Sequence, residues 1–122
     1  MKTVLVVDDS RIMRNIVKNT FLELKIPCQF LEAEDGKKAF QILETNKVSL
    51  ILLDWNMPEM NGMEFLRKVR SMPDYESLPI IMVTSEAAKY NVVEALQNGA
   101  TDYIVKPIRE KIFMEKIMDL QF

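Results

Sequence analysis

Residues 50–54 read Leu-Ile-Leu-Leu-Asp, a run of four aliphatic side chains that ends on a carboxylate. Two further continuously apolar runs, at residues 4–7 and 80–83, have the same character. Strands that are apolar on both faces are typical of a parallel sheet with helices packed on each side. Shorter β-rich runs at residues 29–31 and 103–105 bring the predicted strands to five. The run at 29–31 is more polar, which places it nearer an edge of the sheet.

Amphipathic stretches alternate with these runs and predict helices with a buried apolar stripe. The stripes comprise Ile12, Ile16, Val17, Phe21 and Leu24; Ala39, Phe40 and Leu43; Phe65, Leu66 and Val69; Val92, Val93 and Leu96; and Ile112, Phe113, Ile117 and Leu120. Five β–α units with right-handed crossovers make a doubly wound α/β fold, a five-stranded parallel sheet with helices on both faces. The 122 residues contain no visible repeat or linker, so we expect one domain, 1–122.

Composition excludes several classes of function. The chain has 16 basic and 18 acidic residues, so no basic excess points to direct contact with nucleic acid. No apolar run approaches the ~20 residues of a membrane span, and the start lacks a signal-peptide pattern, so we expect no membrane insertion and a cytoplasmic protein. The single cysteine, Cys28, excludes an intramolecular disulfide, and the absence of histidine excludes Ser-His-Asp triads, Cys-His pairs and His-ligated zinc.

Polar and charged residues follow the apolar runs, where the carboxyl ends of parallel strands form the ligand-binding edge of such a sheet. Asp8 and Asp9 follow the first run and Asp54 the third, while Thr84 and Lys106 follow the fourth and fifth. Three close carboxylates repel one another unless a proton or a cation neutralises them, and an oxygen-only ligand set suits Mg²⁺. Metal, lysine, hydroxyl and a nucleophilic carboxylate are the parts of a phosphoryl-transfer site.

The same residues also have simpler interpretations, in which they only cap, turn or pack. Asp8 and Asp9 could cap the first helix together with Ser10. Asp54 could be a turn residue. Thr84 could be a hydroxyl bonded to its own strand, Lys106 a solvated surface lysine, and Tyr103 a ring that only packs in the strand. The meeting of several such groups at successive strand ends favours a site.

The order of these motifs carries a family resemblance over essentially the whole chain. It lies in Asp8-Asp9, Asp54-Trp55-Asn56-Met57-Pro58-Glu59-Met60-Asn61-Gly62, Thr84-Ser85 and Lys106-Pro107. In these motifs the sequence resembles the receiver domains of two-component response regulators, and most of all the single-domain chemotaxis regulators. The resemblance implies a flavodoxin-like sheet with strand order 2-1-3-4-5. Asn61 stands where the family usually has Asp, and we expect it to cap the next helix as Asp would.

The resemblance also implies the chemistry of the site. Asp54 is the expected phosphoacceptor. The expected ligands of Mg²⁺, for which Mn²⁺ can substitute, are Asp8, Asp9, Asp54 and the backbone carbonyl of Asn56. Thr84 is expected to donate a hydrogen bond to the phosphoryl group, and Lys106 to form an ion pair with it.

Further residues take regulatory roles by the same resemblance. Tyr103 corresponds to a switch aromatic that moves inward on activation. Asn56 and Glu86 correspond to positions that tune the lifetime of the phosphoryl group. The expected output face runs from the fourth helix to the last and comprises Lys89, Tyr90, Val92, Tyr103, Val105 and Lys116.

The predicted function is that of a stand-alone, monomeric response regulator. A histidine kinase phosphorylates Asp54, and the switched face controls a protein partner, with a flagellar motor switch protein in chemotaxis as the leading candidate and a phosphatase as a further partner. Self-phosphorylation and slow self-dephosphorylation are the only expected reactions, so the protein is not a turnover enzyme. A phosphorelay intermediate and a receiver cut from a larger regulator are alternatives within the family.

Two alternatives come from other classes. A Mg²⁺-dependent aspartyl-phosphate hydrolase would need an Asp-x-Asp pair after the first strand, whereas Asp8 and Asp9 are adjacent. A flavodoxin-like binder would need a phosphate loop rich in hydroxyls and glycine there, and two carboxylates repel phosphate unless a metal intervenes.

Overall fold

Strands and helices alternate along the chain in the computed structural model, which describes residues 1–57, 60–85 and 89–120, with the side chains of 89 and 90 outside the description. The elements are β1 (Lys2–Val7), α1 (Arg11–Glu23), β2 (Cys28–Ala33), α2 (Gly36–Thr45), β3 (Leu50–Asp54), α3 (Gly62–Arg70), the 3₁₀ helix η1 (Pro73–Tyr75), β4 (Ile80–Thr84), α4 (Lys89–Gln97), β5 (Asp102–Val105) and α5 (Glu110–Asp119).

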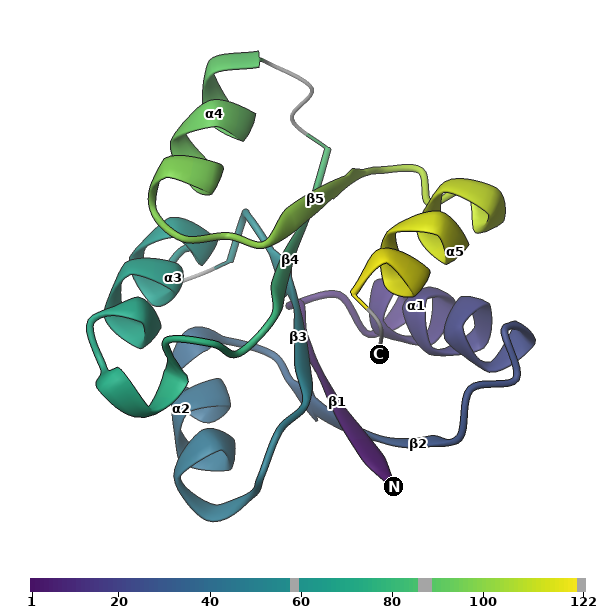
Figure 1. Ribbon diagram of the computed structural model, residues 1–122, viewed down its shortest axis with the longest axis horizontal. Helices are drawn as coiled ribbons and strands as arrows, with labels where there is room; N and C mark the ends of the chain where they lie inside the picture. Colours follow the sequence, from purple (N-terminus) through teal and green to yellow (C-terminus); the bar gives the residue numbers. More distant parts are fainter. Residues whose placement is uncertain (58–59, 86–88, 121–122) are drawn as a thin grey trace.

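The five strands form one parallel sheet in the order β2-β1-β3-β4-β5 (Figure 1). The predicted fold class and strand order are therefore confirmed, and β2 lies at an edge, as its polar sequence indicated. The three runs predicted to be covered on both faces belong to β1, β3 and β4, and these strands are buried apart from Lys2 at the start of β1.

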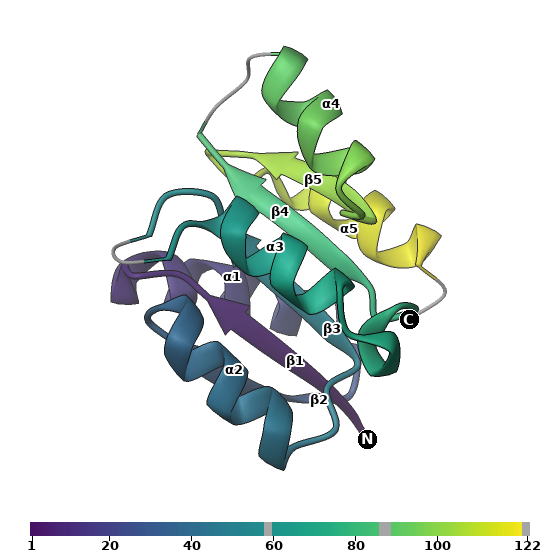
Figure 2. The same ribbon diagram turned by 90° about the vertical axis from the view of Figure 1, so that its left-hand side faces the viewer.

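Helices cover both faces of the sheet, and the sheet separates the core into two clusters. On one face, α2, α3 and α4 pack over a first core cluster that includes Leu5, Leu53 and Met82. On the other face, α1 and α5 pack over a second core cluster that includes Val6, Leu52 and Val83. Figure 2 shows α2, α3 and α4 side by side on the face that it turns to the viewer. Successive side chains of each strand thus enter opposite clusters, as strand geometry requires.

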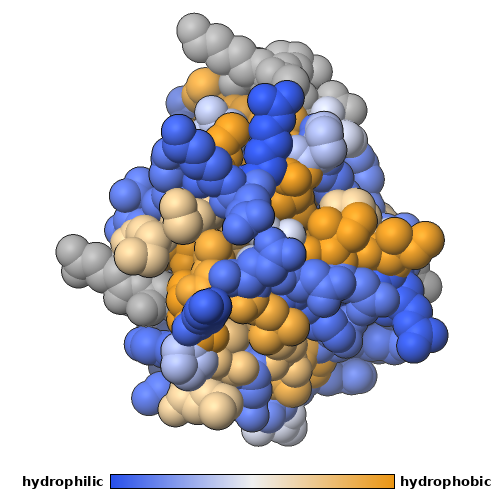
Figure 3. All heavy atoms as spheres, turned by 90° about the vertical axis from the view of Figure 1, so that its right-hand side faces the viewer, coloured by the Kyte–Doolittle hydropathy of each residue, from blue (hydrophilic) through white to orange (hydrophobic). Residues whose placement is uncertain are grey.

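The predicted helical stripes are wider than the faces that the structure buries. Val17 and Phe21 of α1 are buried, but Ile12 is 73% exposed and Ile16 is 41% exposed. The prediction that these two isoleucines belong to the core is wrong, because α1 shares its sheet face with α5 and turns only part of its surface inward. The same correction applies to Val93, Leu96 and Ile112. Figure 3, which turns the side of α1 and α5 to the viewer, shows hydrophobic residues on that surface.

The helices that the structure describes do not include one with both the length and the hydrophobicity of a membrane span.

Candidate functional site

The acidic residues predicted to meet do meet, at the carboxyl ends of β1 and β3. Val7 pairs with Leu53 across the two strands, so Asp8 and Asp54 follow at the same level of the sheet. Carboxylate oxygens of Asp8, Asp9 and Asp54 all lie within 4.8 Å of one another. Asp8 and Asp54 are buried, being 3% and 5% exposed, whereas Asp9 is exposed. The group is a set of oxygen donors with one side open to solvent.

The start of α1 fixes Asp8, and the helix is capped by Ser10 and not by the aspartates. Ser10 is the N-cap, and its side chain accepts a hydrogen bond from the backbone N–H of Met13 at 3.2 Å. The backbone N–H of Ser10 donates to Oδ1 of Asp8 at 2.8 Å. Arg14 donates from Nη1 to the backbone carbonyl of Asp8 at 2.6 Å. The simpler interpretation, that the aspartates cap this helix, is therefore wrong.

Lys106 enters the same edge from the end of β5. Its Nζ lies 3.1 Å from Oδ1 of Asp54 and 3.5 Å from Oδ2 of Asp8. Its backbone N–H donates to the carbonyl of Thr84 at 2.8 Å, which ties the end of β5 to the end of β4. The Lys106–Pro107 peptide bond is cis. The lysine side chain is only 19% exposed, so the interpretation of a solvated surface lysine is wrong.

Burial dominates the electrostatics of the two inner carboxylates. Burial raises the pKa of Asp54 above its ordinary value of 3.8, and the nearby Asp8 charge raises it further. Hydrogen bonds from Lys106 and from the backbone N–H of Asn56 oppose this rise. Burial likewise raises the pKa of Asp8, against the hydrogen bond from Ser10 and the charge of Lys106. One ammonium between two buried carboxylates leaves the pocket short of positive charge, which a divalent cation would supply.

The turn between β3 and α3 depends on a close approach at Gly62. A Cβ atom on this residue would lie 2.4 Å from the carbonyl oxygen of Asp54 and 2.9 Å from Cα of Trp55. Its backbone N–H donates to the carbonyl of Trp55 at 2.8 Å. Asn61 caps α3 in a capping box with Glu64, as predicted. The sequence after Asp54 thus folds the start of α3 directly against the end of β3.

Of the other predicted residues that the structure describes, Thr84 lies at this edge, and the rest belong to β5, α4 and α5. Thr84 ends β4 and is 2% exposed, next to Val83, which pairs with Asp54. Tyr103 of β5 is half-buried and packs against the first core cluster. Tyr103, Val105 and Lys116 line one hollow of about 350 Å³. Val92 on α4 is half-buried and does not line that hollow.

Some predictions are not decided by this geometry. Glu86 lies outside the described residues, as do the side chains of Lys89 and Tyr90. Asn56 is exposed, and the assignment of its carbonyl to a metal stays a prediction. Sequence reasoning missed Arg14, whose Nη1 donates to the backbone carbonyl of Asp8, and Asp102, whose Oδ1 lies 2.8 Å from Nζ of Lys116. Neither residue lies in a recognisable motif, because each acts through a contact that only the folded chain brings together.

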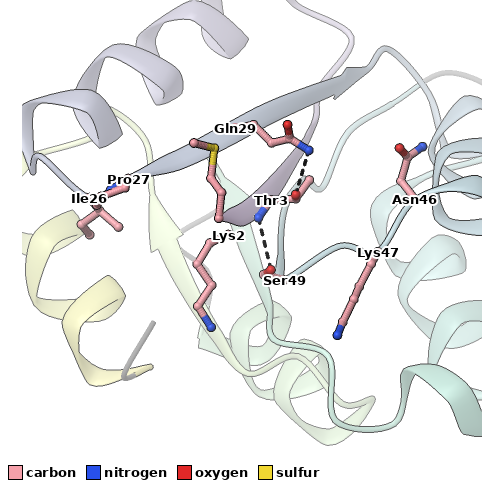
Figure 4. A pocket seen from close by; sticks show the side chains of 9 residues that line it. Lys2, Thr3, Ile26, Pro27, Gln29, Asn46, Lys47 and Ser49 are labelled. Carbon is pink, nitrogen blue, oxygen red and sulfur yellow. Dashed lines mark hydrogen bonds between the residues drawn. The ribbon is translucent and has the colours of Figure 1, made fainter.

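A separate hollow of about 680 Å³ lies at the opposite, amino-terminal edge of the sheet (Figure 4). Its lining includes Thr3, Gln29 and Ser49, whose side chains are engaged with one another and with the backbone. Gln29 donates to the hydroxyl of Thr3 at 3.0 Å, and the backbone N–H of Thr3 donates to Ser49 Oγ at 3.2 Å. The groups with phosphoryl-transfer chemistry lie at the other edge, so we place the functional site there.

Comparison with known proteins agrees with the geometry. A family model described as the response regulator receiver domain matches residues 4–118. The chain belongs to the response regulator receiver family. Among curated relatives, the chemotaxis protein CheY homolog of Campylobacter jejuni is 49% identical over 117 residues, covering 95% of this chain and 89% of that protein. Chemotaxis protein CheY1 of Helicobacter pylori is 46% identical over 114 residues, covering 93% of this chain and 91% of that protein.

Solved structures show the same relationship for this receiver domain. Chemotaxis protein CheY4 of Vibrio cholerae is 32% identical and superposes with a TM-score of 0.88, covering 98% of each chain. A response regulator structure from Chloroflexus aurantiacus has a TM-score of 0.90 at 23% identity, which shows a shared fold. The receiver domain is thus similar to CheY proteins over nearly its full length.

Proposed function

We propose that this receiver domain is a phosphorylation-controlled switch in which Asp54 accepts a phosphoryl group. The observation that supports it best is the placement of one buried carboxylate 3.1 Å from a lysine ammonium, within 4.8 Å of two further carboxylates. Membership of the receiver family and the similarity to CheY proteins support the same assignment.

The reaction follows from the charges around Asp54. An oxygen of its carboxylate attacks the phosphorus atom of a phosphohistidine on a kinase, a P–O bond forms, and the P–N bond to the imidazole breaks. The histidine keeps the electron pair of that bond. Lys106 neutralises negative charge on the transferred group, and the Thr84 hydroxyl donates to one of its oxygens.

A divalent cation fits the oxygen donors of Asp8, Asp9 and Asp54, and Mg²⁺ is the ion we propose, with Mn²⁺ able to substitute. It would supply further positive charge for the transferring phosphoryl group. The same groups, with a water molecule in line, would hydrolyse the acyl phosphate slowly. The protein would therefore catalyse only its own modification and its reversal.

Chemotaxis is the proposed pathway, because the similar proteins from three bacteria are named as chemotaxis proteins. The proposed partners are a histidine kinase, a phosphatase and a flagellar motor switch protein in the cytoplasm. The switch protein would bind the face formed by α4, β5 and α5. Such switches shift a population, so phosphorylation is expected to strengthen partner binding by about 1–3 kcal/mol.

The test is phosphorylation by acetyl phosphate, followed by intact-mass measurement. The protein with Mg²⁺ should gain one phosphoryl group, and a chelator should prevent the gain. Asp54→Asn keeps the shape of the side chain but lacks the nucleophilic oxygen, so it should stay unmodified. Asp74→Asn, on the exposed side chain of η1, is the matched control and should be modified like the parent protein. Equal modification of Asp54→Asn would contradict the proposal.

A further inference from the structure

Tyr103 is in contact with a cation from a different element of the fold. The Nζ atom of Lys116, on α5, lies 4.3 Å from the centroid of the Tyr103 ring. The same Nζ lies 2.8 Å from Oδ1 of Asp102, the residue before Tyr103 in β5. A cation over an aromatic face is attracted by the quadrupole of the ring. One ammonium group therefore binds both the ring and the carboxylate beside it.

The carboxylate is itself fixed by the main chain. Oδ1 of Asp102 also accepts a hydrogen bond from the backbone N–H of Tyr103 at 2.8 Å. The side chains of Lys116 and Asp102 are 21% and 30% exposed, so solvent reaches the pair only in part. Such a pair is screened less than a fully solvated one. We call Asp102 and Lys116 the ring clamp, because together they fix an ammonium on the Tyr103 ring.

The ring clamp reaches from one face of the sheet to the other. Tyr103 packs against the first core cluster, on the side of α4, whereas α5 covers the second cluster, which contains the neighbouring Ile104. β5 is the outermost strand, so no further strand separates α5 from the Tyr103 side. Lys116 therefore extends past the edge of β5, and Figure 1 shows β5 between α4 and α5.

The clamped ring lies close to the candidate phosphorylation site in the register of the sheet. Met82 pairs with Tyr103 and Thr84 pairs with Val105. Because side chains alternate along a strand, Thr84 and Tyr103 lie on the same face of adjacent strands, two residues apart in the register. A displacement of Thr84 towards a phosphoryl group on Asp54 would change the packing beside the ring. A movement of the ring away from Nζ of Lys116 loses the contact that this structure shows at 4.3 Å.

We propose that Lys116 and Asp102 are positioning residues that hold the Tyr103 ring in the position of this structure and oppose its displacement on phosphorylation. The proposal rests on the proposed function, since the phosphoryl group on Asp54 supplies the displacement. Loss of the clamp should raise the fraction of unmodified protein in the displaced state by about three- to tenfold. By reciprocity, a reversible phosphoryl mimic should then bind more tightly, up to the same factor.

The test compares Lys116→Met, Asp102→Asn and the control Lys111→Met. Methionine keeps most of the length of lysine without its charge, and asparagine can still accept from the Tyr103 N–H. Lys111 lies on the same helix and is exposed. The first measurement follows the backbone amide resonances of Met82 and Thr84, on the strand opposite the clamp. In both clamp variants they should shift part of the way along the path that the parent protein follows when beryllium fluoride and Mg²⁺ are added.

The second measurement is the concentration of beryllium fluoride that half-saturates each variant at fixed Mg²⁺. It should fall about threefold or more in Lys116→Met and stay unchanged in Lys111→Met. A folded Lys116→Met with parental resonances and parental half-saturation would overturn the clamp. If acetyl phosphate fails to modify the parent protein while the amides of Lys116→Met still shift, the proposed function fails, and only the part of the proposal that assigns Lys116 and Asp102 to holding the Tyr103 ring stands. Urea unfolding of each variant checks that it is folded.

Discussion

The Lys106 ammonium lies 3.1 Å from the carboxylate of Asp54, in a pocket where it is also shared with Asp8 at 3.5 Å. One positive charge thus serves two buried negative charges, and the exposed Asp9 adds a third. Burial raises the pKa values of both inner carboxyl groups, which means that folding disfavours their ionised forms. The pocket therefore lowers the stability of the metal-free protein at neutral pH.

The first prediction is that Asp54→Asn stabilises the metal-free protein by about 1 kcal/mol at pH 7. A carboxyl group whose pKa is raised on folding stabilises the folded state at pH values below its ordinary pKa of 3.8. This stabilisation is lost as the pH rises through the raised pKa of the folded state. The advantage of the variant should consequently grow from pH 3.5 to pH 7. Urea unfolding at each pH with a chelator measures it, and an advantage that is constant with pH would contradict the electrostatic cause.

The second prediction concerns metal binding reported by Trp55, which follows Asp54 directly and is half-buried against the first core cluster. Mg²⁺ should change its fluorescence with a dissociation constant of about 1 mM, since few protein oxygens bind this strongly hydrated ion. Asp9→Ala removes one of the three carboxylates and should weaken binding about tenfold or more. Asp74→Ala, on η1, should leave the titration unchanged. Absence of any Mg²⁺ response, with no binding by calorimetry, would contradict the metal site.

Much of this arrangement could be predicted from the sequence because short-range patterns determine it. Continuous apolar runs mark β1, β3 and β4, and the parallel topology then brings Asp8, Asp54 and Thr84 to one edge. The same reasoning overestimated the buried faces of helices, as Ile12 shows, because periodicity does not reveal how much of a sheet face each helix can reach. The contact of Lys116 with Asp102 could not be predicted, since it depends on where α5 lies against the end of β5.

The third prediction compares two glycines. A Cβ on Gly62 would lie 2.4 Å from the backbone carbonyl oxygen of Asp54, whereas the nearest atom to a Cβ on Gly36 would be the sulfur of the flexible Met60 side chain, at 2.9 Å. Gly62→Ala should destabilise the protein by about 2 kcal/mol, because backbone must move, and Gly36→Ala by less than about 1 kcal/mol. Gly62→Ala should also weaken Mg²⁺ binding by displacing Asp54. Equal effects of the two substitutions on unfolding and on Mg²⁺ affinity would contradict a special role for Gly62.

The last prediction separates phosphorylation from its consequence at β5. The Thr84 hydroxyl is buried at the end of β4, next to the Val83–Asp54 pair. A phosphoryl group adds nearly two negative charges and new acceptor oxygens, towards which the hydroxyl can donate. Thr84→Ala should therefore still gain one phosphoryl group from acetyl phosphate but lose most of the accompanying change around Tyr103. Thr84→Ser keeps the hydroxyl and should retain the change.

The measurement pairs intact mass with the amide resonances of Tyr103 and Val105, recorded before and after acetyl phosphate is added. Tyr103→Ala should also accept the phosphoryl group, because the ring lies outside the group of carboxylates. The same variant should bind the partner protein more weakly. A Thr84→Ala variant that is fully phosphorylated and still shows the parental shift at β5 would rule out the hydroxyl as the link. In that outcome the assignment of Asp54 would stand, and Lys106 would be the next link to test, because its Nζ lies 3.1 Å from Asp54 and its backbone N–H donates to the Thr84 carbonyl at 2.8 Å.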